Sequence, residues 1–214
     1  MATLWLSMPM TRVYLIRHAE VQNPKRVLYG HLSGFPLSER GRAQASALGR
    51  RLVSSGLRRI VHSPLERAQE TAGLIAAELE PRPELEADPR LIEAEFSRYL
   101  QGVPYWQIPV RRPLWLVHRA RRGLLPGDEA FPALGGRVLE VMRSEVARRP
   151  GEPVALVSHA DPLQAAWILL EGRPHTEREM MRAAIDRAGL LEVDMDGSEV
   201  MGVRYVAPPD AAGG

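Results

Sequence analysis

The chain of 214 residues contains no cysteine. This absence excludes disulfide bonds, thiolate metal sites and a cysteine nucleophile, and it leaves the redox state of the compartment open. Lysine is almost absent too, because Lys25 is the single lysine and every other basic side chain of this type is arginine. The net charge is only +2, and no basic motif with interleaved aromatic residues occurs, so we expect no nucleic-acid partner.

Long uninterrupted apolar runs are also missing. Residues 1–11 lack a basic start, and their apolar stretch is too short for a signal peptide or a membrane span. The longest apolar region, residues 153–170, is broken by His159, Asp161 and Pro162. We therefore expect a cytoplasmic protein with no membrane partner.

What the chain does have is an alternation of short apolar runs and helical stretches. Strands are expected at Arg12–Arg17, Arg59–His62 and Val154–Val157, and edge strands at Leu190–Val193 and Val200–Val206. Such alternation predicts a three-layer α/β/α fold with a mostly parallel central sheet. With 45% hydrophobic residues, residues 1–214 can form one domain with a substantial core.

The expected helices lie between these strands. Ser38 is a candidate N-cap for a helix over Ala43–Ser54, which Gly56 would end. Ser63-Pro64 is expected to cap a helix over Glu66–Glu80, with proline at the first helical position. Two further helices are expected, one over Leu134–Arg149 and one from about Asp161 to Glu171.

The regular pattern fails at about 97–132, a stretch rich in proline that we interpret as an inserted lid. It carries a group of arginines, namely Arg111, Arg112, Arg119, Arg121 and Arg122. These side chains would suit a polyanionic substrate, or they form a solvated face or a contact between two copies of the chain. The sequence does not separate these readings, so a homodimer stays open.

The first candidate functional motif is Arg17-His18-Ala19-Glu20, at the end of a buried strand. An imidazole and a guanidinium at a strand end can act on the same small anion. Ligand sites in open α/β sheets form at the carboxyl ends of the strands. The motif therefore points to phosphate chemistry, although a lone histidine at a strand end is more often structural.

Three further stretches fit the same phosphate site: His62–Ala68, Leu91–Phe96 and Val157–Asp161. The stretch HSPLERAQETA is the most specific of them. Together with Arg17-His18, these motifs resemble the histidine phosphatase superfamily, in particular its phosphoglycerate-mutase-like branch. The resemblance covers the chain from about Arg12 to Val206, with the inserted segment unmatched.

The resemblance implies roles for five residues. His18 would be the nucleophile and form a phosphohistidine, and His159 would donate a hydrogen bond to the phosphoryl group. Arg17 and Arg67 would clamp the phosphate, since a guanidinium offers fixed bidentate donors. Glu93 would be the general acid and then the base for water. This scheme binds a small phosphorylated substrate and uses no metal and no other cofactor.

Other residues have weaker assignments. Asn23 resembles the family's asparagine near the Arg-His pair, and it would contact the phosphoryl group or position its loop. Glu95 competes with Glu93, although strand alternation would point it the other way. Several aromatic residues and histidines remain: Tyr29, His31 and Phe35 as candidates for the pocket mouth, His62 as structural, and His118 and His175 with no partner that we can name.

Phosphomonoester hydrolysis is the leading hypothesis. The segment Glu93–Ser97 lacks the Glu-Arg-His-Tyr-Gly phrase of the mutases, which favours hydrolysis but leaves the mutase reaction open. A non-catalytic phospho-ligand-binding module would not need the intact set of candidate catalytic residues. A metal-dependent phosphatase would need clustered Asp and His ligands, and the sequence offers no such cluster.

Overall fold

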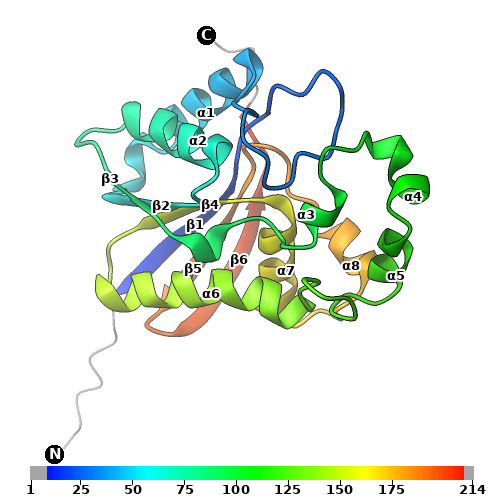
Figure 1. Ribbon diagram of the computed structural model, residues 1–214. Coiled ribbons are helices and arrows are strands. Elements are labelled where there is room, and N and C mark those ends of the chain that lie inside the picture. Colours follow the sequence, from blue (N-terminus) through cyan, green and yellow to red (C-terminus); the bar gives the residue numbers. More distant parts are fainter. Residues whose placement is uncertain (1–8, 210–214) are drawn as a thin grey trace, which may run out of the picture.

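The computed structural model describes residues 9–209, and a six-stranded sheet in the order β3-β2-β4-β1-β5-β6 forms its centre (Figure 1). Strands β1, β2, β3 and β4 run parallel to one another. β5 pairs antiparallel with β1, and β6 pairs antiparallel with β5. The expected three-layer fold with a mostly parallel sheet is confirmed. The strands are β1 Met10–Arg17, β2 Arg59–His62, β3 Glu84–Ala87, β4 Val154–Ser158, β5 Leu190–Asp196 and β6 Glu199–Val206.

Helices cover both faces of the sheet. Figure 1 shows α1 (Glu39–Arg51) and α2 (Glu66–Ala77) on one face, with α6 (Phe131–Arg148) and α7 (Ala160–Leu170) on the other. The remaining helices are short. They are α3 Ser97–Leu100, α4 Ile108–Arg111, α5 Leu114–Ala120 and α8 Glu177–Arg182, with 3-10 turns η1 Val53–Ser55, η2 Pro89–Leu91 and η3 Tyr105–Gln107.

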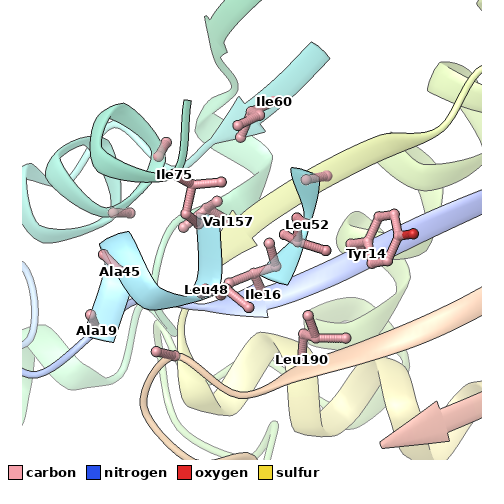
Figure 2. Close-up of a cluster of buried hydrophobic side chains, with 14 of the residues drawn as sticks. Tyr14, Ile16, Ala19, Ala45, Leu48, Leu52, Ile60, Ile75, Val157 and Leu190 are labelled. Atoms are coloured by element: carbon pink, nitrogen blue, oxygen red, sulfur yellow. The ribbon is translucent and has the colours of Figure 1, made fainter. Parts of the chain in front are cut away.

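The two sides of the sheet have separate apolar cores because successive side chains of a strand point to opposite faces. Ile16 of β1 packs in one cluster with Leu48 of α1 and Ile75 of α2 (Figure 2). Its neighbour Leu15 lies in the other cluster, with Met142 of α6. Central strands buried on both faces explain the continuous apolar runs of the sequence.

Local sequence signals fix several helix boundaries. Ser38 caps α1 as expected, because its Oγ accepts a hydrogen bond of 3.0 Å from Gly41 N. The helix begins at Glu39, four residues before the expected start at Ala43. Gly56 has a positive φ of 72°, which glycine adopts at low cost, and it ends η1.

The prediction that Ser63-Pro64 caps α2 was wrong. The helix begins at Glu66, Leu65 occupies the cap position, and no side chain caps it. The Ser63 hydroxyl instead contacts Leu65 N at 3.3 Å and the His159 ring at 2.7 Å. Ser63 therefore follows directly after β2 and bonds His159, and it does not cap the helix.

The prediction of two edge strands at the carboxyl-terminal end was half wrong. β6 is an edge, but β5 lies between β1 and β6. The other edge is β3, which the sequence analysis did not expect. All residues of β3 are exposed. Its sequence ELEA alternates glutamate with an apolar residue, but over four positions only, the shortest alternation that indicates a strand.

The segment at 97–132 is only partly irregular, since α3, α4 and α5 lie within it. A small apolar cluster holds this segment together, formed by Phe96, Leu100, Val103 and Ile108. Backbone hydrogen bonds join it to the loop after β1: Leu28 N donates to Val103 O at 2.9 Å, and Gly102 N to Leu28 O at 2.8 Å. Its role as a lid remains a prediction. Within residues 9–209 no helix is long and apolar enough to span a bilayer.

Candidate active site

The candidate site forms where three parallel strands end at one edge of the sheet. In the strand register, Arg17 of β1 lies opposite Ser158 of β4, and His62 of β2 lies opposite Val157. The next residues along the chain therefore meet. The ring centroids of His18 and His159 are 5.1 Å apart.

The ring of His18 is fixed in one orientation and is 1% exposed. Its Nδ1 lies 2.8 Å from Ala19 O, and Arg67 Nε donates to its Nε2 at 3.2 Å. A carbonyl oxygen only accepts, so Nδ1 carries the hydrogen and Nε2 carries the lone pair. Burial, together with the charges of Arg67 and Arg17, holds the pKa of His18 well below its ordinary value, so the ring is neutral.

Arg67 connects this histidine to the loop after β1. It lies in the first turn of α2 and is 1% exposed. Besides its bond to His18, its Nη2 donates to Gly30 O at 2.9 Å, and its guanidinium lies 4.7 Å from the centroid of the Tyr29 ring. A buried guanidinium thus lies directly against the lone pair of His18.

Arg17 approaches from the end of β1. Its Nη1 donates to Ile185 O at 2.6 Å, and its Nε is buried without a hydrogen-bond partner among residues 9–209. The donors of Arg17 are therefore not all satisfied by the protein, which leaves part of the fork available to an anion.

His159 precedes α7 and is fully buried. Its Nε2 lies 2.7 Å from Ser63 Oγ, which itself accepts from Leu65 N, so the hydroxyl hydrogen is free to point at Nε2. Nδ1 then carries the ring hydrogen, and it has no acceptor among the described residues. Burial and the nearby Arg67 and His18 hold the pKa of His159 well below its ordinary value.

Glu93 follows the turn η2 and is half-buried. Its Oε1 accepts a hydrogen bond of 2.9 Å from Ala94 N. Burial, helped by the negative charge of Asp161 and opposed by Arg67, raises the pKa of Glu93 to about 7. The competitor Glu95 is exposed and pairs with Arg98. It lies in the turn that leads into α3 and not in extended backbone, so its direction does not come from the strand alternation that was considered for this stretch.

A cavity of about 150 Å³ opens beside these groups. Arg17 and Glu93 form part of its wall. His18, Arg67 and His159 are buried and do not line it, but Arg67 contacts the wall residues Gly30 and Tyr29 and also bonds His18. The rest of the wall consists of Leu28, Tyr29, Gly30, Ala94, Phe96, Ser97, Leu100, Tyr105, His118 and Asp161. Within residues 9–209 no group of three His, Cys, Asp or Glu side chains could hold a metal ion.

The structure does not bring Asn23 to this cavity. Its amide Nδ2 donates to Val27 O at 2.7 Å, and its Oδ1 accepts from Val27 N at 3.1 Å. Both polar ends of the side chain are therefore used within the loop. Of the two roles considered for Asn23, positioning the loop fits its contacts.

The loop residues after β1 divide between the site and packing. Tyr29 lines the cavity, and Phe35 packs on its ring with centroids 5.4 Å apart. His31 donates from Nε2 to Glu93 O at 3.1 Å and so ties this loop to the general-acid candidate. Among residues 9–209 the ring of His62 bonds the carbonyl of Ser63, which fits a structural role. His175 lies near Phe131.

Sequence reasoning missed Asp161 and His118 as parts of the cavity wall. Asp161 lies in the first turn of α7, only two residues after His159, and this proximity to a candidate site residue was an available signal. His118 had no such signal, because its partner Asp128 and the ring of Phe96 come together only in the folded chain.

The arginines of the inserted segment do not line the cavity. Arg122 is buried and pairs with Asp161, at 3.2 Å, and with Glu177. The others make contacts elsewhere: Arg111 with Gln107, Arg112 with the Tyr99 ring, Arg119 with the Trp115 ring, and Arg121 with solvent.

Comparison with known proteins agrees with this arrangement. The sequence profile of the histidine phosphatase superfamily (branch 1) matches residues 13–207. The chain is 33% identical over 203 residues to the uncharacterized protein Rv0525 of Mycobacterium tuberculosis, covering 92% of this chain and 96% of that one. It is 31% identical to the probable phosphoglycerate mutase GpmB of Yersinia enterocolitica, with 88% and 87% covered. The solved structure of Bacillus stearothermophilus YhfR superposes with a TM-score of 0.81 at 26% identity, covering 94% and 98%.

Proposed function

The chain belongs to the histidine phosphatase superfamily, and from this premise we propose that it hydrolyses small phosphomonoesters through a phosphohistidine on His18. The observation that carries the proposal is the state of the His18 ring. Its Nε2 lone pair is directed at a guanidinium, with a carboxylic acid of raised pKa on the adjoining cavity wall.

In the first step, His18 Nε2 attacks phosphorus in line with the bond to the leaving oxygen. The N–P bond forms, the P–O bond breaks, and protonated Glu93 gives its proton to the leaving alkoxide. Arg67 turns its Nε from His18 to a phosphoryl oxygen, and Arg17 and His159 Nδ1 supply further donors. These donors stabilise the charge on the equatorial oxygens in the transition state.

In the second step, water attacks the phosphohistidine from the side that the alcohol has left. Glu93, now ionised, accepts a proton from the water while the N–P bond breaks. Inorganic phosphate leaves, and Nε2 of His18 regains its lone pair. One carboxyl group thus serves as acid and then as base, and a pKa of about 7 suits both roles near neutral pH.

The direct test is to trap the covalent intermediate. Brief incubation with a ³²P-labelled ester, followed by denaturation in alkali, should leave a base-stable, acid-labile label on His18. His18→Ala should lose both the label and turnover. Retained turnover in a folded His18→Ala protein would refute the mechanism.

His62 offers a matched control for this experiment. It is also buried at a strand end, and its Nδ1 contacts the carbonyl of the following residue at 2.9 Å, as in His18. Unlike the His18 ring, its ring makes no hydrogen bond with Arg67. His62→Gln should therefore keep the label, and a label that moved to His62 would exclude His18 as the nucleophile.

Phosphoryl transfer of the mutase type remains the second candidate, since the GpmB protein of Yersinia enterocolitica carries that name. The two reactions share the first step and differ in the fate of the phosphohistidine. Incubation with 3-phosphoglycerate distinguishes them: release of inorganic phosphate supports hydrolysis, whereas formation of 2-phosphoglycerate without release supports the mutase.

A further inference from the structure

His118 is the one histidine among the described residues that line the cavity, and the proposed mechanism does not use it. It lies on α5 in the inserted segment and is 6% exposed. Its Nδ1 is 2.8 Å from Asp128 Oδ1, and its ring stacks on Phe96 with centroids 4.2 Å apart and planes 10° from parallel. A ring that is held by a hydrogen bond to a carboxylate and by an aromatic face has a fixed direction.

The hydrogen-bonding capacity of this ring is therefore defined. The Asp128 carboxylate accepts the hydrogen of Nδ1, so Nε2 is the atom left over. No side chain or backbone group of residues 9–209 makes a hydrogen bond with that Nε2. Ser97 Oγ, also on the cavity wall, is buried without a partner among the same residues. His118 Nε2 and Ser97 Oγ can therefore each form a hydrogen bond with a ligand in the cavity.

The charges of the wall limit what that partner can be. Arg17 is the only arginine among the residues that line the cavity, and it belongs to the phosphate end. The carboxyl groups of Glu93 and Asp161 also line it. In the proposed mechanism Glu93 is protonated and Asp161 pairs with Arg122, so neither group supplies a positive charge for a second anion. The remainder combines apolar side chains such as Leu28, Phe96 and Leu100 with the uncharged hydroxyl groups of Tyr29, Ser97 and Tyr105, so the wall favours an uncharged group.

Size adds a further limit. The cavity of about 150 Å³ is similar to an engineered protein cavity of about 150 Å³ that binds benzene. Because the phosphate end at Arg17 belongs to the same space, the room left for the alcohol suits a chain of about three or four carbons.

We propose that His118 recognises a hydroxyl group on the alcohol part of the substrate, which is a phosphate ester of a small, uncharged, hydroxylated compound. The hydroxyl donates to His118 Nε2 and accepts from or donates to Ser97 Oγ. This inference rests on the proposed function, because it concerns the leaving group of the same reaction. It narrows the substrate class to esters without a second charged group.

The test compares three esters that differ at one end: propyl phosphate, glycerol 1-phosphate and 3-phosphoglycerate. The wild-type protein should have a kcat/KM for glycerol 1-phosphate about tenfold or more above that for propyl phosphate, the ratio that about 1.4 kcal/mol produces. It should use 3-phosphoglycerate less well than glycerol 1-phosphate. A ratio near one, or a preference for 3-phosphoglycerate, would overturn the inference.

A double variant tests the role of His118 itself. His118→Phe combined with Asp128→Leu keeps the stack on Phe96 and leaves no unpaired carboxylate in the interior. The preference for glycerol 1-phosphate over propyl phosphate should fall about fivefold or more, because the hydroxyl loses its acceptor. His175→Gln, a histidine outside the cavity wall, is the matched control and should keep the wild-type ratio.

The outcomes separate the two proposals. If the phosphohistidine label on His18 is absent with every ester, the proposed function fails. If the label and hydrolysis are present but the ratio is the same in the wild type and the double variant, only the recognition by His118 fails. The wild-type comparison decides the substrate class even if the double variant does not fold.

Discussion

Glu93 combines a catalytic assignment with an unfavourable environment. Its carboxyl group lies beside the carboxyl of Asp161 and is largely removed from water, so its ionised form is disfavoured. A proton donor for a leaving oxygen needs this property near neutral pH. The residue therefore supports three predictions at the residue scale.

The first prediction concerns activity. Glu93→Gln should lower kcat by about two to four orders of magnitude, the usual contribution of a general acid, because glutamine has no proton to give. Glu95→Gln is the control, since that side chain is exposed and pairs with Arg98. Steady-state assays with a slow alcohol leaving group measure both. Equal losses, or a larger loss with Glu95→Gln, would assign the acid wrongly.

The second prediction concerns the pH dependence of the rate. Because free Glu93 must be protonated for the first step, kcat/KM should be constant below about pH 7 and should fall tenfold per unit above it. The pKa of His18 lies well below its ordinary value, so protonation of His18 does not lower kcat/KM in the region just below pH 7. An ester with a leaving group that needs no proton should lose the alkaline decline. If the decline persists, a group other than Glu93 causes it.

The third prediction concerns stability. The pKa of Glu93 is about 7 in the folded protein against an ordinary 4.5, so the folded state holds this proton more tightly than the unfolded state. The stability that protonation supplies is therefore complete below pH 4.5 and is lost as the pH rises to about 7. At pH 8 the free energy of unfolding of Glu93→Gln should exceed that of the wild type by on the order of 1–3 kcal/mol, measured by urea denaturation. Lower stability of the variant at pH 8 would contradict this.

At the scale of elements, α7 and the inserted segment meet through charged contacts close to the site. Arg122, which follows α5, bonds Asp161 in the first turn of α7 and Glu177 in the first turn of α8. Arg122 thus neutralises part of the charge that raises the pKa of Glu93. This contact links the position of the inserted segment to proton transfer.

Removing that contact should move the pH profile. In Arg122→Met the charge of Asp161 acts on Glu93 without its counterion, so the pKa of Glu93 should rise and the alkaline limb of kcat/KM should shift upward by about 0.5–1 pH unit. The adjacent Arg121 is exposed, and Arg121→Met should leave the limb in place. A shift in the opposite direction, or equal shifts in both variants, would mean that Asp161 and Arg122 do not set this pKa.

At the scale of the whole molecule, the end of β1, the helix α2 and the strand β4 with α7 bring Arg17, Arg67 and His159 to one edge of the sheet. Under the proposed function these side chains are the donors for one phosphate, and Arg67 only exchanges His18 for a phosphoryl oxygen, so a mimic of the in-line transition state should bind tightly.

Vanadate tests this preorganisation. It should inhibit competitively, and at about 100 times its Kd it should stabilise the fold by about 2.7 kcal/mol, measured as a rise in Tm. Arg67→Met should lose most of this stabilisation. Activity should survive EDTA, since the arginines supply the positive charge. Loss of activity in EDTA that magnesium restores would instead favour a metal-dependent phosphatase.

Much of the architecture was predictable because it depends on local signals. The apolar runs of β1, β2 and β4, the Ser38 cap and Gly56 are each encoded within a few neighbouring residues. β3 was not predictable, since its exposed ELEA sequence becomes a strand only by pairing with β2. The same limit applies to β5, whose place inside the sheet depends on its partner β1.

For the site, the sequence by itself determined the candidate residues that lie at strand ends, because parallel strands bring their carboxyl ends to one edge. Tertiary structure alone decided the rest. It assigned the lone pair of His18 to Nε2, kept Asn23 within its loop, and left the arginines of the inserted segment out of the cavity wall. It also placed His118 on the cavity wall, where its ring is hydrogen-bonded to Asp128. The bonds of His18 to Ala19 and of Asn23 to Val27 are local. The bonds of Arg67 to His18 and of Arg122 to Asp161, by contrast, join residues distant in the chain, and no local pattern encodes them.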